Sequence, residues 1–570
     1  MRVNRPATHS PVFDELRAVQ RTHGYLPEGE LRALADRLDL PLYALQSVAS
    51  FYPHFFLKPP ARVEARVCGD MSCHRYGGNA LRESLARRFQ GQDVNVQHVS
   101  CLGRCDLAPA IAVNDEIYER VDEAGAASLI LTALGGQPLP AHSHTPPASI
   151  ASDPYAGGAQ YGVLREYLQS RDWTGMIAKL KESGLRGLGG AGFPTGLKWE
   201  IVRAQPGPEK FIVCNADESE PGTIKDRFIM THAPHLVIEG MILGGLVSGA
   251  RHGIFYIRHE YTEQEHIIAA EIRRCYREGL LGASLLGTDL GFDLEVFVSP
   301  GLYICGEESA LLEAIEGKRA EPRNKPPFPG QQGLWHQPTV INNVETFFFV
   351  PVILARGLEW LKAQGRNGAV GVKFVGVSGD VRYPGVFEVP MGTTYRELIE
   401  QHAGGVPPGR TIKSYAPSGP AGGYLPASML DLPLDWNAMT QAGATVGSGA
   451  IVVCDDRACM LDMALNAVRF FRNESCGKCV PCRTGSQKLV DILTSWTQGS
   501  RGPDDLALYE ELSHALRLTS ICGLGQVVPV PIASVMKHFR DEVEAHVRDR
   551  VCPAGVCAGL GARAGGLARV

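Results

Sequence analysis

Three cysteines spaced two residues apart constrain the fold of this chain more than any other feature. Cys476, Cys479 and Cys482 form a C-x-x-C-x-x-C run, and Cys522 follows forty residues later. Three thiolates in one tight loop suit three corners of an iron–sulfur cube, and a distant fourth thiolate completes the set. Structural zinc and packed thiols are the alternatives. The triple run favours a [4Fe-4S] cluster, which requires a segment folded around it.

A second group of four cysteines lies near the N-terminal end of the chain. Cys68 and Cys73 follow one predicted strand, and Cys101 and Cys105 follow another. Two loops at one end of a small α/β unit would bring these pairs face to face. Four thiolates that bridge two irons fit this arrangement, and zinc is the alternative.

Composition narrows the classes of protein to which the chain can belong. It has 570 residues, 15 cysteines and a formal net charge of -5, which gives no reason to expect nucleic acid or a membrane surface as partner. The first residues lack the apolar stretch of a signal peptide, and the most apolar segment, 235–250, is too short to span a membrane. We therefore expect a cytoplasmic protein whose grouped cysteines serve metal or redox chemistry.

Hydrophobic periodicity predicts a multidomain α/β chain. The expected divisions are a helical segment (1–60), a small α/β unit (61–135), a Pro/Ala/Ser/Gly-rich linker (136–162), an open α/β sheet (163–345), a compact α+β domain (346–445) and a helical region with a tail (446–570).

Particular elements follow from local patterns. Helices are expected at 30–38, 40–48, 79–89, 395–402, 460–471 and 505–516, strands at 63–67 and 94–99, hairpins over 109–118 and 373–389, and a frayed tail from 558.

Several of the glycines are concentrated in one short segment of the chain. The stretch from Gly184 to Gly196 contains six glycines in thirteen residues. Such a loop lets backbone N–H groups approach a phosphate closely, and Lys198 supplies a positive charge just beyond it. A flexible surface loop is the alternative interpretation.

Two acidic clusters accompany this loop. The first, 215–222, follows an apolar strand at 211–214, and the second, 303–308, opens a helix. Carboxylates at strand ends beside a phosphate loop suit ribose hydroxyls and a nicotinamide amide, and they repel a 2′-phosphate, which favours NAD over NADP. A solvated acidic face is the alternative.

Together these motifs resemble a known family. Residues 187–199, 215–223, 303–308, 341–346 and 474–483 resemble the NADH-oxidising flavoprotein subunit of respiratory complex I, and the likeness covers about 165–550. Residues 10–130 resemble its companion, the thioredoxin-like [2Fe-2S] subunit. The fusion resembles the flavin-bearing beta (diaphorase) subunit of soluble NAD-dependent formate dehydrogenases and NAD-reducing hydrogenases, and residues 419–435 favour the formate dehydrogenase version.

The resemblance implies a fold for each part of the chain. It implies a helical N-terminus with a thioredoxin-like [2Fe-2S] domain, a Rossmann-like FMN/NADH domain, a ubiquitin-like (soluble-ligand-binding) α+β domain and a C-terminal helical bundle with [4Fe-4S].

The resemblance also implies the residues that bind FMN and NAD(H). They are Gly187, Gly189, Gly190 and Lys198 at FMN, helped by Asn215, Asp217, Asn342, Asn343 and Thr346. Glu220, the expected catalytic residue, lies near the nicotinamide, Glu307 and Glu308 at the NADH ribose, and Lys325 and Phe328 near the adenosine half. Further cofactor-binding residues are Gly192, Glu218, Tyr303 and Gly306. Ile201 stands where the family often has an aromatic residue for adenine stacking.

The activity implied is electron exchange between NAD(H), FMN and the two clusters, with no protein general base. The [4Fe-4S] cluster would lead to a large catalytic subunit in a hetero-oligomer, and the [2Fe-2S] cluster would store electrons or tune the flavin. A molybdenum or tungsten formate dehydrogenase is the expected partner. A NAD-reducing hydrogenase, or a non-catalytic electron-transfer role, is the alternative.

Seven cysteines remain after the two clusters. Cys552, Cys557 and His546 resemble a C-terminal element of multimeric iron hydrogenases in which zinc links the tail to an upstream cysteine, here Cys459. Three thiolates and one imidazole suit zinc, and buried structural thiols are the alternative. The other four are expected to be packed core residues: Cys214, Cys275, Cys305 and Cys454.

Overall fold

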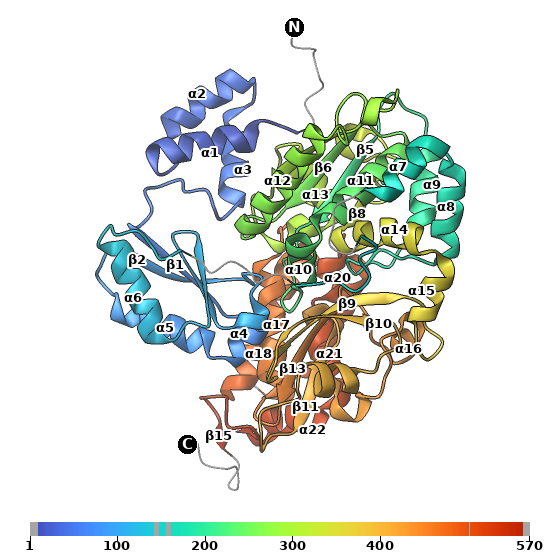
Figure 1. Cartoon of the computed structure of the whole chain (residues 1–570). Coiled ribbons are helices and arrows are strands. Elements are labelled where there is room, and N and C mark those ends of the chain that lie inside the picture. Colours follow the sequence, from blue (N-terminus) through green and yellow to red (C-terminus); the bar gives the residue numbers. More distant parts are fainter. Residues whose placement is uncertain (1–8, 142–147, 156–160, 501, 563–570) are drawn as a thin grey trace. The chain divides into compact units, whose positions relative to one another are not determined.

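The computed structural model describes residues 9–141, 148–155, 161–500 and 502–562, which form two compact units (Figure 1). The first unit comprises Met1–Ala61, Ser143–Ser219 and Asp226–Ala363. The second comprises Arg62–His142, Glu220–Lys225 and Gln364–Val570. The predicted linker lies partly outside the described residues.

A four-stranded parallel sheet forms the centre of the first unit. Its order is β7-β6-β5-β8, with β5 at Phe211–Ala216, β6 at His252–Ile257, β7 at Asp293–Val298 and β8 at Thr339–Asn343. β5 and β6 are buried almost throughout, as expected of strands covered on both faces. All four carboxyl ends meet at one edge of the sheet, where ligands bind in open α/β folds.

Helices surround this sheet. They are α7 (Gly162–Ser170), α8 (Trp173–Glu182), α9 (Thr195–Ala204), α10 (Lys225–His232), α11 (Pro234–Ser248), α12 (Thr262–Arg277), α13 (Glu308–Ile315), α14 (Val344–Arg356) and α15 (Leu358–Gln364). α11 is buried along its whole length and packs closely on α14, since a Cβ on Gly240 would lie 2.1 Å from the carbonyl oxygen of Phe347. Within the part of the chain that the structure describes, no helix combines the length and hydropathy needed to cross a bilayer.

The predicted N-terminal helices are present and belong to the first unit. They are α1 (Val12–His23), α2 (Glu28–Leu38) and α3 (Leu42–Phe51). The ring of Phe13 packs edge-on against those of Tyr52 and Phe297, with centroids 5.1 and 6.2 Å away. Arg17 donates to the carbonyl oxygen of Val298 at 2.8 Å, at the end of β7. Apolar and polar contacts thus join the helices to the edge of the sheet where the strands end.

The small α/β unit opens the second unit. Its sheet has the order β2-β1-β3-β4, formed by β1 (Val63–Cys68), β2 (Val94–Val99), β3 (Ala110–Val113) and β4 (Glu116–Glu119), with helices α4 (Met71–Arg75), α5 (Gly78–Arg88) and α6 (Glu123–Leu134). β1 and β2 are parallel, and β3 and β4 form the expected hairpin. Asn114 and Asp115, with φ of 48° and 73°, make its turn.

The compact α+β domain has a five-stranded sheet of order β10-β9-β13-β11-β12. The strands are β9 (Val372–Gly379), β10 (Gly385–Pro390), β11 (Ile412–Ala416), β12 (Leu425–Pro426) and β13 (Ala450–Asp455). The expected hairpin is β9–β10, but the expected helix at 395–402 is a π-helix, Glu397–His402. β13 pairs with β9 and β11, so the sheet extends beyond residue 445.

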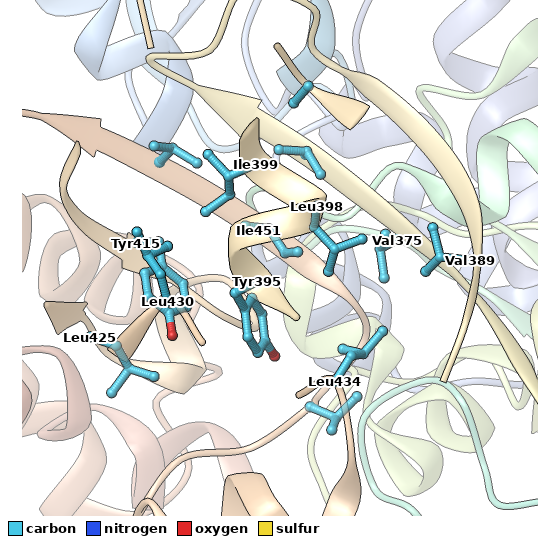
Figure 2. Packing of buried hydrophobic residues seen from close by; sticks show 14 of the residues in the cluster. Val375, Val389, Tyr395, Leu398, Ile399, Tyr415, Leu425, Leu430, Leu434 and Ile451 are labelled. Atoms are coloured by element: carbon cyan, nitrogen blue, oxygen red, sulfur yellow. The ribbon is translucent and has the colours of Figure 1, made fainter. Parts of the chain in front are cut away.

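The core of this domain is filled by side chains. Leu398 and Ile399 of the π-helix pack with Tyr395, Tyr415 and Val375, all of them fully buried (Figure 2). The rings of Tyr395 and Tyr415 lie 4.9 Å apart between centroids.

The C-terminal region is helical, as expected. It contains α17 (Met460–Asn473), α18 (Val480–Gln498), α19 (Asp505–Thr519), α20 (Gly523–Val527), α21 (Val530–His538), α22 (Arg540–Glu544) and a π-helix at Ala545–Asp549. The shorter α16 (Trp436–Gln441) belongs to the α+β domain, where its Met439 is part of the core. The expectation of a frayed tail from 558 is wrong as far as residue 562, because β14 (Val551–Cys552) pairs with β15 (Gly561–Ala562). Residues 563–570 lie outside the described residues.

Candidate functional site

The glycine-rich loop between α8 and α9 is closed by its own backbone. The N–H of Gly187 donates to the carbonyl oxygen of Phe193 at 2.8 Å, and that of Gly192 returns to Gly187 at 3.2 Å. Gly190 and Gly192 have φ of 120° and 67°, which disfavour a residue with a side chain. The loop leads directly into the N-terminus of α9, a favourable place for an anion.

Side chains from β8 and α9 line the same loop. A Cβ on Gly189 would lie 3.0 Å from the Cβ of Asn343, so the loop passes against that side chain. Thr346 accepts from the N–H of Leu188 at 2.9 Å. Lys198 donates to the carbonyl oxygen of Ile341 at 2.8 Å, and burial lowers its pKa.

The side chain of Asn342 indicates whether the glycine-rich loop and the side chains that line it fit a cofactor. Its Oδ1 accepts from the indole N–H of Trp199 at 2.9 Å. Its Nδ2 is buried and has no hydrogen-bond partner among the described residues. A buried amide without an acceptor is costly, so a bound group with an acceptor atom fits here. These donors fit FMN: the glycines let backbone N–H groups approach a phosphate, Lys198 adds a positive charge, and the amide of Asn342 can donate a hydrogen bond.

The residues after β5 carry the first acidic cluster. Asn215 donates to the carbonyl oxygen of Gly306 at 2.8 Å, which ties the two acidic clusters together. Asp217 accepts hydrogen bonds from Ser219 and, at 2.9 Å, from Ser299 at the end of β7. Burial raises the pKa of Asp217 to about 6. A buried carboxylate held by two hydroxyls is well placed to accept from ligand hydroxyls.

Arg258 and Tyr261 are site residues that the sequence interpretation missed. Arg258, at the end of β6, is buried and donates to the carbonyl oxygen of Glu218 at 2.6 Å and to Glu260 at 2.9 Å. Tyr261 donates to the carboxylate of Glu218 at 2.9 Å, and that carboxylate also accepts from the N–H of Asp226 at 2.7 Å. Glu218, predicted to bind a cofactor, is therefore held by these three hydrogen bonds, two to its carboxylate and one to its carbonyl oxygen.

The second acidic cluster is organised around a lysine. Lys325 Nζ donates to Glu307 at 2.7 Å and to Glu308 at 2.6 Å. Burial acts to lower the pKa of Lys325, but the two carboxylates outweigh it and raise the pKa. Tyr303 is half-buried nearby in the chain, and the ring of Phe328 is 54% exposed. An exposed ring three residues after this lysine is suited to contact a planar base.

Glu220 belongs to the second unit. Its carboxylate accepts at 3.4 Å from the N–H of Ala421 and at 3.4 Å from the hydroxyl of Ser448. Burial raises its pKa to about 7. Glu220 therefore changes charge close to neutral pH.

The four cysteines of the α/β unit form two close pairs. The sulfurs of Cys101 and Cys105 lie 3.3 Å apart, and the thiols of Cys68 and Cys73 form the other pair. No three of these sulfurs lie within 4.8 Å of one another, although all four residues are described. A single tetrahedral ion would draw all four together, whereas two pairs suit two irons.

The thiol of Cys482 interacts electrostatically with those of the other three C-terminal cysteines. Burial raises the pKa of Cys482 to about 12, and the thiols of Cys479, Cys522 and Cys476 add to the rise. No three of these four sulfurs lie mutually within 4.8 Å, and all four residues are described. This separation fits a multinuclear cluster better than one zinc ion.

A third set of ligands is gathered more tightly. Cys459, His546, Cys552 and Cys557 are all buried, and their ligand atoms lie within 4.8 Å of one another. Cys459 Sγ is 3.3 Å from His546 Nε2 and 3.7 Å from Cys557 Sγ. Tetrahedral zinc–thiolate bonds of about 2.3 Å place sulfurs about 3.7 Å apart, so the donor set fits zinc. Nδ1 of His546 donates to the carbonyl oxygen of Glu542 at 2.7 Å, which directs Nε2 at the sulfurs.

All fifteen cysteines are among the described residues, and none of them forms a disulfide. Those expected to be packed in the core are buried: Cys214, Cys275, Cys305 and Cys454.

Comparison with known proteins agrees with this geometry. Residues 180–352 match the family model of the Nuo51 FMN-binding domain, and 462–546 match the NADH-ubiquinone oxidoreductase-F iron-sulfur binding region. Residues 3–133 match the thioredoxin-like [2Fe-2S] ferredoxin, and 374–423 match the SLBB domain.

An F-type NADH-quinone oxidoreductase subunit of Rhizobium meliloti (strain 1021) is 43% identical over 399 residues, which cover 70% of this chain and 95% of that relative. The chain belongs to this oxidoreductase family. The HndC subunit of the NADP-reducing hydrogenase of Solidesulfovibrio fructosivorans is also 43% identical, over 68% of this chain and 78% of HndC. A chain in the crystal structure of a NAD+-reducing [NiFe]-hydrogenase in the H2-reduced state has a TM-score of 0.85 at 32% identity, covering 95% of this chain and 94% of that one.

Membership of this family confirms several sequence predictions. The chain is a subunit of a NAD-dependent flavin and iron–sulfur oxidoreductase, with domains for FMN, NADH, [2Fe-2S] and [4Fe-4S]. The multidomain α/β fold is confirmed as well. The roles of individual residues remain predictions.

Proposed function

We propose that this chain is the diaphorase subunit of a hetero-oligomeric enzyme, where it interconverts NADH and NAD+ and exchanges electrons with a separate catalytic subunit. The observation that carries the proposal is the glycine-rich loop 184–196 together with Asn342, whose buried Nδ2 has no hydrogen-bond acceptor among the described residues. FMN, when bound, accepts a hydride and releases single electrons. Cysteines that form no disulfide among the described residues suit a reducing, cytoplasmic compartment.

Each group of side chains has a proposed task. The glycine loop and Lys198 hold the FMN phosphate, while Asn215, Asp217, Asn342, Asn343 and Thr346 hold the rest of the flavin. Glu220 lies near the nicotinamide. The sets beginning at Cys68 and at Cys476 hold [2Fe-2S] and [4Fe-4S].

The purified chain tests this activity. It is expected to show a flavin absorbance band and NADH-dependent reduction of an artificial dye. If both are absent after reconstitution with FMN, the chain is a non-catalytic electron-transfer subunit.

The pairing of Lys325 with Glu307 and Glu308 is the proposed reason why the protein prefers NADH to NADPH. Glu308→Gln keeps the side-chain size but removes one of the two charges that neutralise Lys325. The freed cation then attracts a 2′-phosphate, so we expect kcat/KM for NADPH to rise about tenfold, equivalent to about 1.4 kcal/mol. Steady-state dye reduction with each nucleotide measures this change. Glu313→Gln, on the same helix but paired with Arg323, is the matched control. An unchanged NADPH rate would contradict the assignment.

We propose a molybdenum- or tungsten-dependent formate dehydrogenase as the catalytic partner, supported by the sequence of residues 419–435. A NAD-reducing hydrogenase is the second candidate, because the likeness to a chain of the NAD+-reducing [NiFe]-hydrogenase extends over 95% of this chain. Purifying the tagged chain with its native partners distinguishes the two. Formate-dependent NAD+ reduction with molybdenum or tungsten supports the first, and hydrogen-dependent reduction with nickel supports the second.

We propose that Cys459, His546, Cys552 and Cys557 bind zinc, which cross-links α17 to the C-terminal segment. Cys552→Ala removes one ligand from a fully buried set. We expect about one zinc per chain in the wild type, none in the variant, and a loss of about 3 kcal/mol in the free energy of unfolding. Mass spectrometry of bound metals and denaturant unfolding measure these quantities. In the control, Cys275→Ser, a hydroxyl can replace the thiol that bonds to Tyr161, so zinc content should stay the same. A wild-type protein without zinc would refute the site.

A further inference from the structure

Cys105 accepts a hydrogen bond from a part of the chain far away in sequence. The backbone N–H of Gly222 points at Cys105 Sγ, with 3.1 Å between nitrogen and sulfur, and both groups are buried. Gly222 lies in the segment 220–225, which continues directly from the residues after β5 that we propose to bind FMN. Gly103 supplies a second such bond, to Cys101 at 3.3 Å.

The contact is built into the second unit. The N–H of Thr223 donates to the carbonyl oxygen of Glu220 at 3.0 Å, which closes a turn, and the hydroxyl of Thr223 bonds to that of Ser448 at 2.8 Å. Ile224 is buried against Cys101 and Cys105. The turn therefore has little freedom to move away from the cysteines.

Gly222 itself cannot carry a side chain without moving. Its φ is +94°, and a Cβ there would lie 2.7 Å from Cγ2 of Val452 and 3.2 Å from Cβ of Ala450, both on β13. Gly376 of β9, the register partner of Ala450, also admits this segment, since a Cβ on it would lie 2.8 Å from Cγ1 of Ile224. The close fit places the N–H of Gly222 against the sulfur.

We propose that the segment 220–225 tunes the [2Fe-2S] cluster through the hydrogen bond from Gly222 to Cys105. This proposal rests on the assignment of Cys68, Cys73, Cys101 and Cys105 as cluster ligands. One-electron reduction adds one negative charge to the cluster and its four thiolates, and no bond breaks. A donor to a ligand sulfur stabilises the more negative state and raises the reduction potential. The segment that follows the flavin-binding residues thereby also adjusts the potential of the cluster.

The test is a redox titration of the full chain, with dithionite as reductant and the EPR signal of the reduced [2Fe-2S] cluster as the measurement. In Gly222→Ala the new Cβ collides with Val452, so the segment moves and the bond is lost. We expect the ratio of reduced to oxidised cluster at a fixed potential to fall about tenfold, equivalent to about 59 mV for one electron.

Two further variants separate this effect from general disruption. Val452→Ala keeps the N–H of Gly222 in place and should leave the potential unchanged. In Gly222→Ala with Val452→Ala the side-chain collision is relieved, so the potential should return part of the way to the wild-type value.

The outcomes distinguish this proposal from the cluster assignment. A Gly222→Ala protein with an intact cluster signal and an unchanged potential overturns the tuning proposal alone. A wild-type protein without a [2Fe-2S] signal overturns the assignment of the cluster. If neither Gly222 variant assembles the cluster, pulsed EPR of the 15N-glycine-labelled wild type tests the hydrogen bond directly, by counting the glycine amide nitrogens that couple to the reduced cluster. Two coupled amide nitrogens, from Gly222 and Gly103, support the bond, and one alone refutes it.

Discussion

Gly189→Val is expected to abolish FMN binding and to lower NADH-dependent dye reduction by about 100-fold or more. A Cβ on residue 189 would lie 3.0 Å from Cβ and 3.3 Å from Cγ of Asn343. The two further methyl carbons of valine make this clash worse, so the loop must move and its backbone N–H groups leave the positions in which we propose that they hold FMN. Flavin released by heat denaturation, measured per chain, and the rate of dye reduction record the effect.

Gly29→Val is the matched control for this change. Gly29 is exposed on α2, its φ is not in the left-handed region, and a Cβ there meets nothing within 4 Å. This variant should retain its FMN and its rate. Gly189→Val protein that still binds one FMN per chain would show that the glycine loop does not hold the cofactor.

Most secondary structure was predictable because it depends on short-range patterns. The alternation at 63–67 and the turn at Asn114-Asp115 correspond to β1 and to the β3–β4 hairpin. β13 was harder to place, because it pairs with β9, which lies some seventy residues earlier in the chain. Its apolar sequence shows that it is a strand, but no local signal shows which sheet it joins.

The site was predictable where a strand ends in carboxylates, and less so elsewhere. Asp217 and Glu218 follow β5, and that position at the sheet edge marks them as ligand-binding. Arg258 directly follows β6, so the same rule applies to it. However, the sequence Arg258-His259-Glu260 is also typical of a solvated polar turn. Its burial and its bond to the carbonyl oxygen of Glu218 appear only in three dimensions. The strand rule, applied to all four strands, would have found it.

Cys482→Ala is expected to remove the [4Fe-4S] cluster and to stop electron flow to the catalytic subunit. Cys482 is the most buried of the four thiols, so solvent has little access to replace the ligand that alanine removes. In the assembled complex we expect turnover with the partner's substrate to fall about 100-fold or more, because the exit for single electrons is lost. EPR of the reduced protein should lack the [4Fe-4S] signal.

The flavin half of the reaction separates this effect from misfolding. Bleaching of the flavin by NADH, followed by stopped flow, should stay within about twofold of wild type, since hydride transfer to FMN requires no cluster. Cys275→Ser, a buried thiol outside all three ligand groups, should keep both clusters and full turnover. A Cys482→Ala complex that keeps its turnover would mean that electrons leave by another route, and the two-pair set at Cys68 and Cys101 would then be the group to test.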